Sequence, residues 1–175
     1  MSLESILAYN ELVCKEAFMD KSDKTNVMRI LDGKKVPYIP HFYDPSITTG
    51  TEVAAVLGQD ADHVFKTLVT TGKTGAHYVF VIPVQQELDL KKAARAAGEK
   101  SVEMLKQKDL LPLTGYIHGG CSPIGMKKQF MTTLDESARS MEQICISGGR
   151  VGAQVQLDPG DLERFMRISY ADLTV

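Results

Sequence analysis

Hydrophobic and polar residues are spaced so that helices and strands are expected to alternate along the chain. Residues 3–18 are expected to form an amphipathic helix, because their apolar members recur near helical spacing. A second helix is expected over residues 25–32, stopped by Gly33. Capping residues predict three more, which are a helix from Thr49 to Gly58, one over residues 90–97 capped by Asp89, and one opened by Asp158 and Pro159.

Strand-like runs lie between these helices. They cover residues 36–42, 64–70, 77–82, 144–147 and 153–157, with Ile117 alone in a short piece. Residues 79–82 are apolar on both faces, as in a central strand, whereas Gln154 and Gln156 alternate with apolar residues as in a half-open strand. The order predicts an α+β fold in which one mixed, bent or barrel-like sheet is surrounded by helices.

The length and composition indicate a single folded domain. The chain has 175 residues, of which 43% are hydrophobic, enough for one well-buried core and short for two. We expect residues 1–24 to form the N-terminal helix with a short connection, and residues 25–175 to form the domain.

The charge argues against a protein that coats nucleic acid, because the net charge is −2 and the pI is near 6.1. Contact with RNA would have to be local. A mid-chain run of basic residues is either such a local patch or an ordinary solvated surface. Its members are Lys91, Lys92, Arg95, Lys100, Lys106, Lys108, Lys127 and Lys128. No leader or membrane-spanning run is recognised, so a soluble cytoplasmic protein is expected.

The cysteines and histidines do not suggest a metal site. Cys14, Cys121 and Cys145 are odd in number and contain no C-x-x-C pair, which argues against a disulfide framework or structural zinc. The four histidines lack the H-x-x-x-H and H-E-x-x-H spacings. We expect no metal and no other cofactor.

Lys66 is the first candidate for chemistry, since it places a charge within the strand-like run of residues 64–69. Alternation puts Val64, Lys66 and Leu68 on one face. An ammonium group among apolar neighbours needs a partner, a water-filled opening or a substrate. The lysine is therefore either an edge residue whose head reaches water or part of a site.

The second candidate is a glycine-rich bend, residues 114–125. Gly119 and Gly120 permit close approach of the backbone, so their N–H groups, with that of Cys121, either face a ligand or belong to a tight turn. A serine-hydrolase elbow is disfavoured because Pro123 has no N–H and the spacing is one residue too long. Ser122 is expected to shape the bend through a hydrogen bond to the backbone. No sequence argument gives Cys121 a base, so a packed thiol is its ordinary role.

Four blocks together resemble one family. They are Val64-Phe65-Lys66-Thr67-Leu68-Val69, Leu88-Asp89-Leu90-Lys91-Lys92, the bend from Thr114 to Gly125, and Ser147-Gly148-Gly149 followed by Gly152. In this order and spacing, from about residue 25 to about residue 173, they resemble YbaK/EbsC proteins. These are free-standing aminoacyl-tRNA deacylases related to the editing domain of bacterial prolyl-tRNA synthetases.

The resemblance implies removal of a mischarged amino acid, most typically cysteine on tRNA(Pro), from the tRNA 3′ end. Lys66 would orient the ester, the backbone at Gly119 and Gly120 would receive the oxyanion, and a cysteinyl substrate would expel itself as a thiolactone. It further implies a set of substrate-binding residues. These are Tyr43, Thr67, Cys121, Ser122, Pro123, Gly125, Ser147, Gly148, Gly149 and Gln154. The implied partners are aminoacyl-tRNA and prolyl-tRNA synthetase, with no DNA and no membrane.

One departure from the family leaves alternatives open. Gln154 stands where some relatives carry an acidic residue, and a neutral amide offers the substrate α-ammonium no charge partner. A hydrolytic deacylase for alanyl or other small aminoacyl esters is therefore an alternative. A non-catalytic aminoacyl- or nucleotide-binding module is another, and so is an interaction subunit that docks a partner through residues 3–18.

Overall fold

The computed structural model describes residues 23–175, so the helix expected over residues 3–18 lies outside the described part. The helices are α2 (Asn26–Gly33), α3 (Gly50–Val56), α4 (Leu90–Ala97), α5 (Gln107–Thr114) and α6 (Pro159–Glu163), with short 3-10 helices η1 (Ala61–His63) and η2 (Glu136–Ser140). The strands are β1 (Ile39–Phe42), β2 (Phe65–Gly72), β3 (His77–Pro83), β4 (Val102–Met104), β5 (Met131–Asp135), β6 (Ile144–Ser147), β7 (Ala153–Leu157) and β8 (Ile168–Ala171).

Side-chain caps fix the helix starts that the sequence predicts. The Thr25 hydroxyl accepts from the N–H of Met28 at 3.2 Å and begins α2. Asp89 accepts from the N–H groups of Lys91 and Lys92 in α4, and Asp158 accepts from the N–H of Gly160 in α6. Each cap satisfies N–H groups that have no partner inside the helix, so the local sequence sets the boundary.

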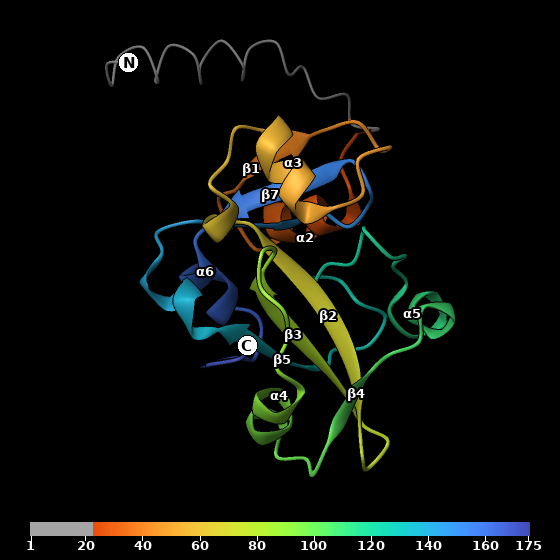
Figure 1. The fold of residues 1–175 in the computed structure, drawn as a ribbon. Coiled ribbons are helices and arrows are strands. Elements are labelled where there is room, and N and C mark those ends of the chain that lie inside the picture. The colour runs from red at the N-terminus through yellow and green to blue at the C-terminus, as the bar shows by residue number, and fades with distance from the viewer. Residues whose placement is uncertain (1–22) are drawn as a thin grey trace.

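The α+β class is confirmed, but the strands divide between two sheets and do not form the single sheet expected. The smaller sheet is antiparallel in the order β1-β7-β6, and the larger is mixed in the order β4-β2-β3-β5-β8. A parallel bridge between Val64 and Cys145 joins the start of β2 to β6. Figure 1 shows the smaller sheet with α2 and α3 at one end of the long β2–β3 pair, and α4 near its other end.

The main hydrophobic core lies between the two sheets and extends to α2 and α6. Residues from both sheets, α2 and α6 meet there with almost no exposure, among them Met28, Val81, Leu134, Val155 and Leu162. The opposite face of the larger sheet buries a second cluster that includes Phe80, Ile82 and Ala93, with α4 as its cover. Burial on both faces explains the continuous apolar run in β3.

Ile117 is 54% exposed and lies in a loop, so the short strand expected there is wrong. Within residues 23–175, no helix is long and apolar enough to cross a membrane. The same residues contain no group of three or more His, Cys, Asp or Glu side chains placed to hold a metal ion.

Candidate active site

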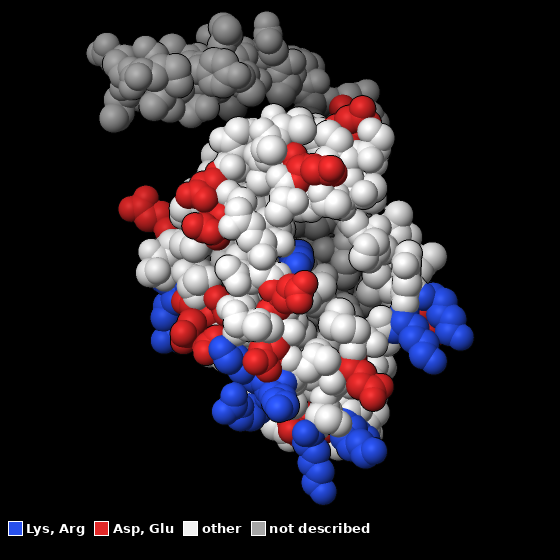
Figure 2. All heavy atoms as spheres, in the orientation of Figure 1, with Lys and Arg blue, Asp and Glu red and all other residues white. Residues whose placement is uncertain are grey.

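A pocket of about 390 Å³ lies where the two sheets meet, between α3 and α5. It is lined by the first half of β2, the end of β6, the start of β7, part of the glycine-rich bend and the N-terminal half of α5. Figure 2 shows the molecule hollowed on the face between these elements, with a basic side chain visible inside the hollow. Lys66 is the only lysine or arginine among the described lining residues, so the pocket holds a single cationic side chain.

Lys66 is held at this pocket by its position near the start of β2. Its side chain is partly buried, and its Nζ lies 3.4 Å from the carbonyl oxygen of Val84. Burial lowers the pKa of the Lys66 ammonium below its usual 10.5, an effect that the negative charge of Glu87 opposes. A partly desolvated cation with one long protein contact has donors left for a ligand oxygen.

The edge of β2 beside Lys66 is open. On this side β4 pairs only with residues 70–72, and the N–H of Leu105 reaches the carbonyl of Val69 at 2.9 Å. Alternate residues of an antiparallel strand turn their backbone groups to the same edge, so Thr67 turns its N–H and C=O the same way as Val69. The Thr67 hydroxyl oxygen is buried and has no partner within residues 23–175. Thr67 therefore brings unpaired polar groups to the pocket.

The glycine-rich bend supplies the facing backbone. Gly119 lines the pocket with φ +85°, a conformation that favours glycine. Gly120 packs so closely on the β6–β7 hairpin that an added Cβ would lie 3.0 Å from the backbone nitrogen of Val151. Ser122 is buried, and its hydroxyl accepts from the N–H of Ile124 at 3.3 Å, as the sequence predicts. The bend is thus fixed by its own contacts and by the hairpin.

Cys121 is a packed thiol. It is 9% exposed, and burial raises its pKa to about 12, so it is protonated at neutral pH. Cys145 is similar, with a pKa raised to about 12 by burial. Neither thiol has a histidine hydrogen-bonded to it among the described residues, and neither environment suits a nucleophile.

The structure separates the sequence-predicted site residues into two groups. Seven line the pocket, namely Tyr43, Lys66, Thr67, Gly119, Cys121, Ser147 and Gln154. Six do not line it, namely Gly120, Ser122, Pro123, Gly125, Gly148 and Gly149. The second group shapes the backbone behind the pocket, as Gly149 does at φ +94°, where a Cβ would lie 2.7 Å from a Val27 methyl group.

Several lining residues carry no signal in the sequence that points to a site. Thr48, Gln107 and His118 contribute polar groups, and they come from three segments far apart in the chain. Leu110 and Met104 give the pocket an apolar side. His118 directly precedes Gly119 in the glycine-rich bend. This position in the sequence is the one signal that could have indicated that His118 lines the pocket.

The basic run in the middle of the chain divides into separate clusters. Lys91 and Arg95 lie on α4, whereas Lys106 and Lys108 flank the start of α5, next to the pocket-lining Gln107. Figure 2 shows basic side chains gathered near α5 and near α4, with acidic ones elsewhere on the same face. The cluster at α5 is the one that borders the pocket.

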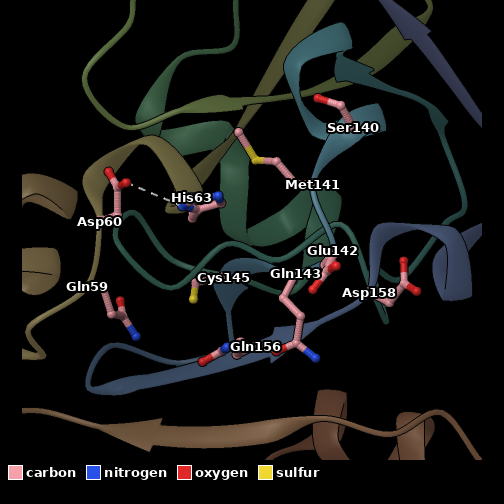
Figure 3. Close-up of a pocket in the computed structure, with 10 residues that line it drawn as sticks. All are labelled: Gln59, Asp60, His63, Ser140, Met141, Glu142, Gln143, Cys145, Gln156 and Asp158. Atoms are coloured by element: carbon pink, nitrogen blue, oxygen red, sulfur yellow. Dashed lines mark hydrogen bonds and ion pairs between the residues drawn. The ribbon is translucent and has the colours of Figure 1, made fainter. Parts of the chain in front are cut away.

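A second, more open depression of about 970 Å³ lies on the other side of β6 and is drawn in Figure 3. Its walls carry three acidic side chains, Asp60, Glu142 and Asp158. The Nδ1 of His63 lies 3.6 Å from the Oδ2 of Asp60. No lysine or arginine lines it among the described residues. It therefore suits an anionic RNA poorly.

Comparison with known proteins gives one family. The family profile "Aminoacyl-tRNA editing domain" matches residues 44–165. The chain is 46% identical over 153 residues to "Putative Cys-tRNA(Pro)/Cys-tRNA(Cys) deacylase EbsC" of Enterococcus faecalis, covering 86% of this chain and 93% of that protein. It is 31% identical over 117 residues to "Proline--tRNA ligase" of Shouchella clausii, of which it covers 20%.

The solved structures agree with this assignment. The chain matches "Crystal structure of a putative trans-editing enzyme for prolyl tRNA synthetase" with a TM-score of 0.74 and 25% identity, covering 85% of this chain and 96% of that one. The fold is thus that of an aminoacyl-tRNA editing domain. The chain belongs to the aminoacyl-tRNA editing domain family, in its YbaK/EbsC branch.

Proposed function

We propose that this protein is a trans-editing deacylase that removes cysteine from mischarged tRNA(Pro). The observation that carries the proposal is Lys66, a partly desolvated cation in a pocket of about 390 Å³ that the glycine-rich bend also lines. The 46% identity to the Enterococcus faecalis protein supports the substrate class, because that protein is named for cysteinyl-tRNA.

The pocket residues suit a reaction that depends on positioning. The Lys66 ammonium and the backbone N–H groups at Thr67 and Gly119 are the donors available to the ester carbonyl and to the oxyanion that develops on it. The cysteinyl sulfur attacks its own carbonyl carbon, a C–S bond forms and the C–O bond to the ribose breaks. The thiol proton passes to the departing ribose oxygen through water, and a thiolactone leaves.

This mechanism assigns no protein nucleophile. Cys121 and Cys145 are protonated at neutral pH, and Ser122 uses its hydroxyl inside the bend. Holding two reacting groups of one substrate in contact distance is itself worth a large rate factor. An alanyl ester lacks the internal thiol, so in this pocket it would need an attacking water molecule.

The test is a panel of charged tRNAs. Purified protein is incubated with Cys-tRNA(Pro), Ala-tRNA(Pro), Ser-tRNA(Ser) and Pro-tRNA(Pro), and ester loss is followed together with thiolactone release. We expect fast loss of cysteine with thiolactone as the product. Loss of alanine alone would assign the hydrolytic alternative, and binding without acceleration of any ester would assign the non-catalytic module.

The same proposal places the acceptor strand of the tRNA over α5. Lys106 and Lys108 are exposed beside the pocket-lining Gln107. Each phosphate contact with a duplex steepens the slope of log K against log salt concentration by about 0.9. Changing both lysines to alanine should weaken tRNA binding and flatten its salt dependence. The matched control replaces Lys91 and Arg95 on α4, which should leave both unchanged.

A further inference from the structure

An amide pair closes one wall of the pocket. Gln154 of β7 lines the pocket and is 4% exposed. The Nε2 of Gln59, which follows α3, donates to the Oε1 of Gln154 at 2.6 Å. Gln59 also lines the second depression, where Figure 3 shows it beside Asp60. The sequence predicts a half-open Gln154, and the segment that carries Gln59 is what buries it.

The pair has one unpaired atom that the fold does not account for. The Oε1 of Gln59 is buried and has no partner within residues 23–175, and the nitrogen of Gln154 donates to none of those residues. If both amides turn over together, Gln154 donates to Gln59 and offers its oxygen to the pocket. Both arrangements contain one hydrogen bond and one unpaired Gln59 atom, so the bound group decides between them.

An aminoacyl ester brings a positive group into this pocket. Its α-ammonium needs hydrogen-bond acceptors, yet no Asp or Glu stands among the described lining residues, and Lys66 has the same charge. The Ser147 hydroxyl already accepts from the N–H of Gly149 at 3.1 Å. The amide oxygen of Gln154 is therefore an acceptor that the pocket can present when both amides turn over together.

We propose that Gln59 and Gln154 form a coupled amide pair that recognises the α-ammonium of the substrate. Gln154 contacts the ammonium through its oxygen, and Gln59 is a positioning residue that accepts the released N–H of Gln154. This rests on the proposed function for the identity of the ligand, an aminoacyl ester.

The test uses two unreactive adenosine analogues that differ by one amine. One carries cysteine on a 3′ amide, and the other carries 3-mercaptopropionate, which keeps the thiol and carbonyl but lacks the ammonium. Binding to wild type, Gln59→Leu and Gln59→Glu is measured by calorimetry. The control is Gln156→Leu, because Gln156 also lies on β7 but pairs with Gln143 at 2.7 Å and lines the second depression.

We expect wild type to bind the amine-bearing analogue more tightly than the deaminated one. Gln59→Leu should lose about tenfold in affinity for the amine-bearing analogue, the size of one hydrogen bond to a charged group. Its affinity for the deaminated analogue should not change. Gln59→Glu can only accept, so it should retain the preference, and Gln156→Leu should behave as wild type. Equal losses for both analogues, or no loss, would overturn the inference. A wild type that binds the analogues with this preference but cleaves no charged tRNA would instead sink the proposed function alone.

Discussion

Gly120 is where a single methyl group tests how the glycine-rich bend is held against the β6–β7 hairpin. A Cβ there would lie 3.0 Å from the backbone nitrogen of Val151 and 3.1 Å from the Cα and carbonyl carbon of Arg150. All three are backbone atoms, so no change of rotamer relieves the contact. The bend or the hairpin has to retreat by a few tenths of an ångström.

The expected cost follows from the size of that displacement. Overpacking a close contact typically costs about 1–3 kcal/mol. In a domain of this length, 1 kcal/mol changes the melting temperature by about 2–4 °C. Gly120→Ala should therefore melt about 2–12 °C below wild type. It should also raise KM for the charged tRNA, because Gly119 and Cys121 on either side line the pocket.

The matched control is Gly33→Ala at the end of α2. A Cβ at Gly33 meets nothing within 4 Å, and its φ is not positive, so the melting temperature should be unchanged or slightly higher. Both variants are compared with wild type by circular dichroism during heating. A Gly120→Ala protein that melts with wild type would refute the close packing of the bend.

Three further predictions concern single side chains. Folding lowers the pKa of Lys66, so the unfolded chain binds more protons than the folded one as pH approaches 10.5. The free energy of unfolding of wild type, relative to that of Lys66→Met, should therefore rise as pH approaches 10.5. Urea midpoints of the two proteins that stay parallel from pH 8 to 10.5 would contradict this. Burial raises the pKa values of Cys121 and Cys145 to about 12, so both thiols should resist iodoacetamide at pH 8 until denaturant is added. Labelling is followed by peptide mass spectrometry. Rapid labelling of either cysteine in the native protein would count against its burial. Thr67→Val removes a buried hydroxyl that has no partner within residues 23–175, so it should leave the melting temperature unchanged while raising KM. The control is Thr70→Val, which removes a hydroxyl that donates to the Tyr78 carbonyl and should cost about 1 kcal/mol of stability. Equal losses of melting temperature would show that the Thr67 hydroxyl has a structural role.

The elements that sequence reasoning finds are those whose cause is local. Thr25, Asp89 and Asp158 cap helices because their side chains bond N–H groups two or three residues away. The elements it missed depend on distant partners. Strands β5 and β8 are short and pair in parallel with segments far along the chain, and α5 contains Pro112, which local rules place outside a helix.

The candidate site divides in the same way. Lys66 stands out because one charge interrupts an apolar run, and the structure places it in the pocket. Gln154 is buried although alternation predicts a half-open side chain, because Gln59 covers it from 95 residues away in the chain. Gln107 and Thr48 reach the pocket only through packing of α5 and the loop before α3, which no local pattern encodes.

The most direct test of the central claim is the single-turnover rate at which Lys66→Ala cleaves Cys-tRNA(Pro). The control is Lys73→Ala, an exposed lysine just beyond the end of β2. If the Lys66 ammonium stabilises the oxyanion of the ester, its removal should lower the rate by about 10²–10³-fold while the control keeps the wild-type rate. A folded Lys66→Ala protein that cleaves as fast as wild type would contradict the account.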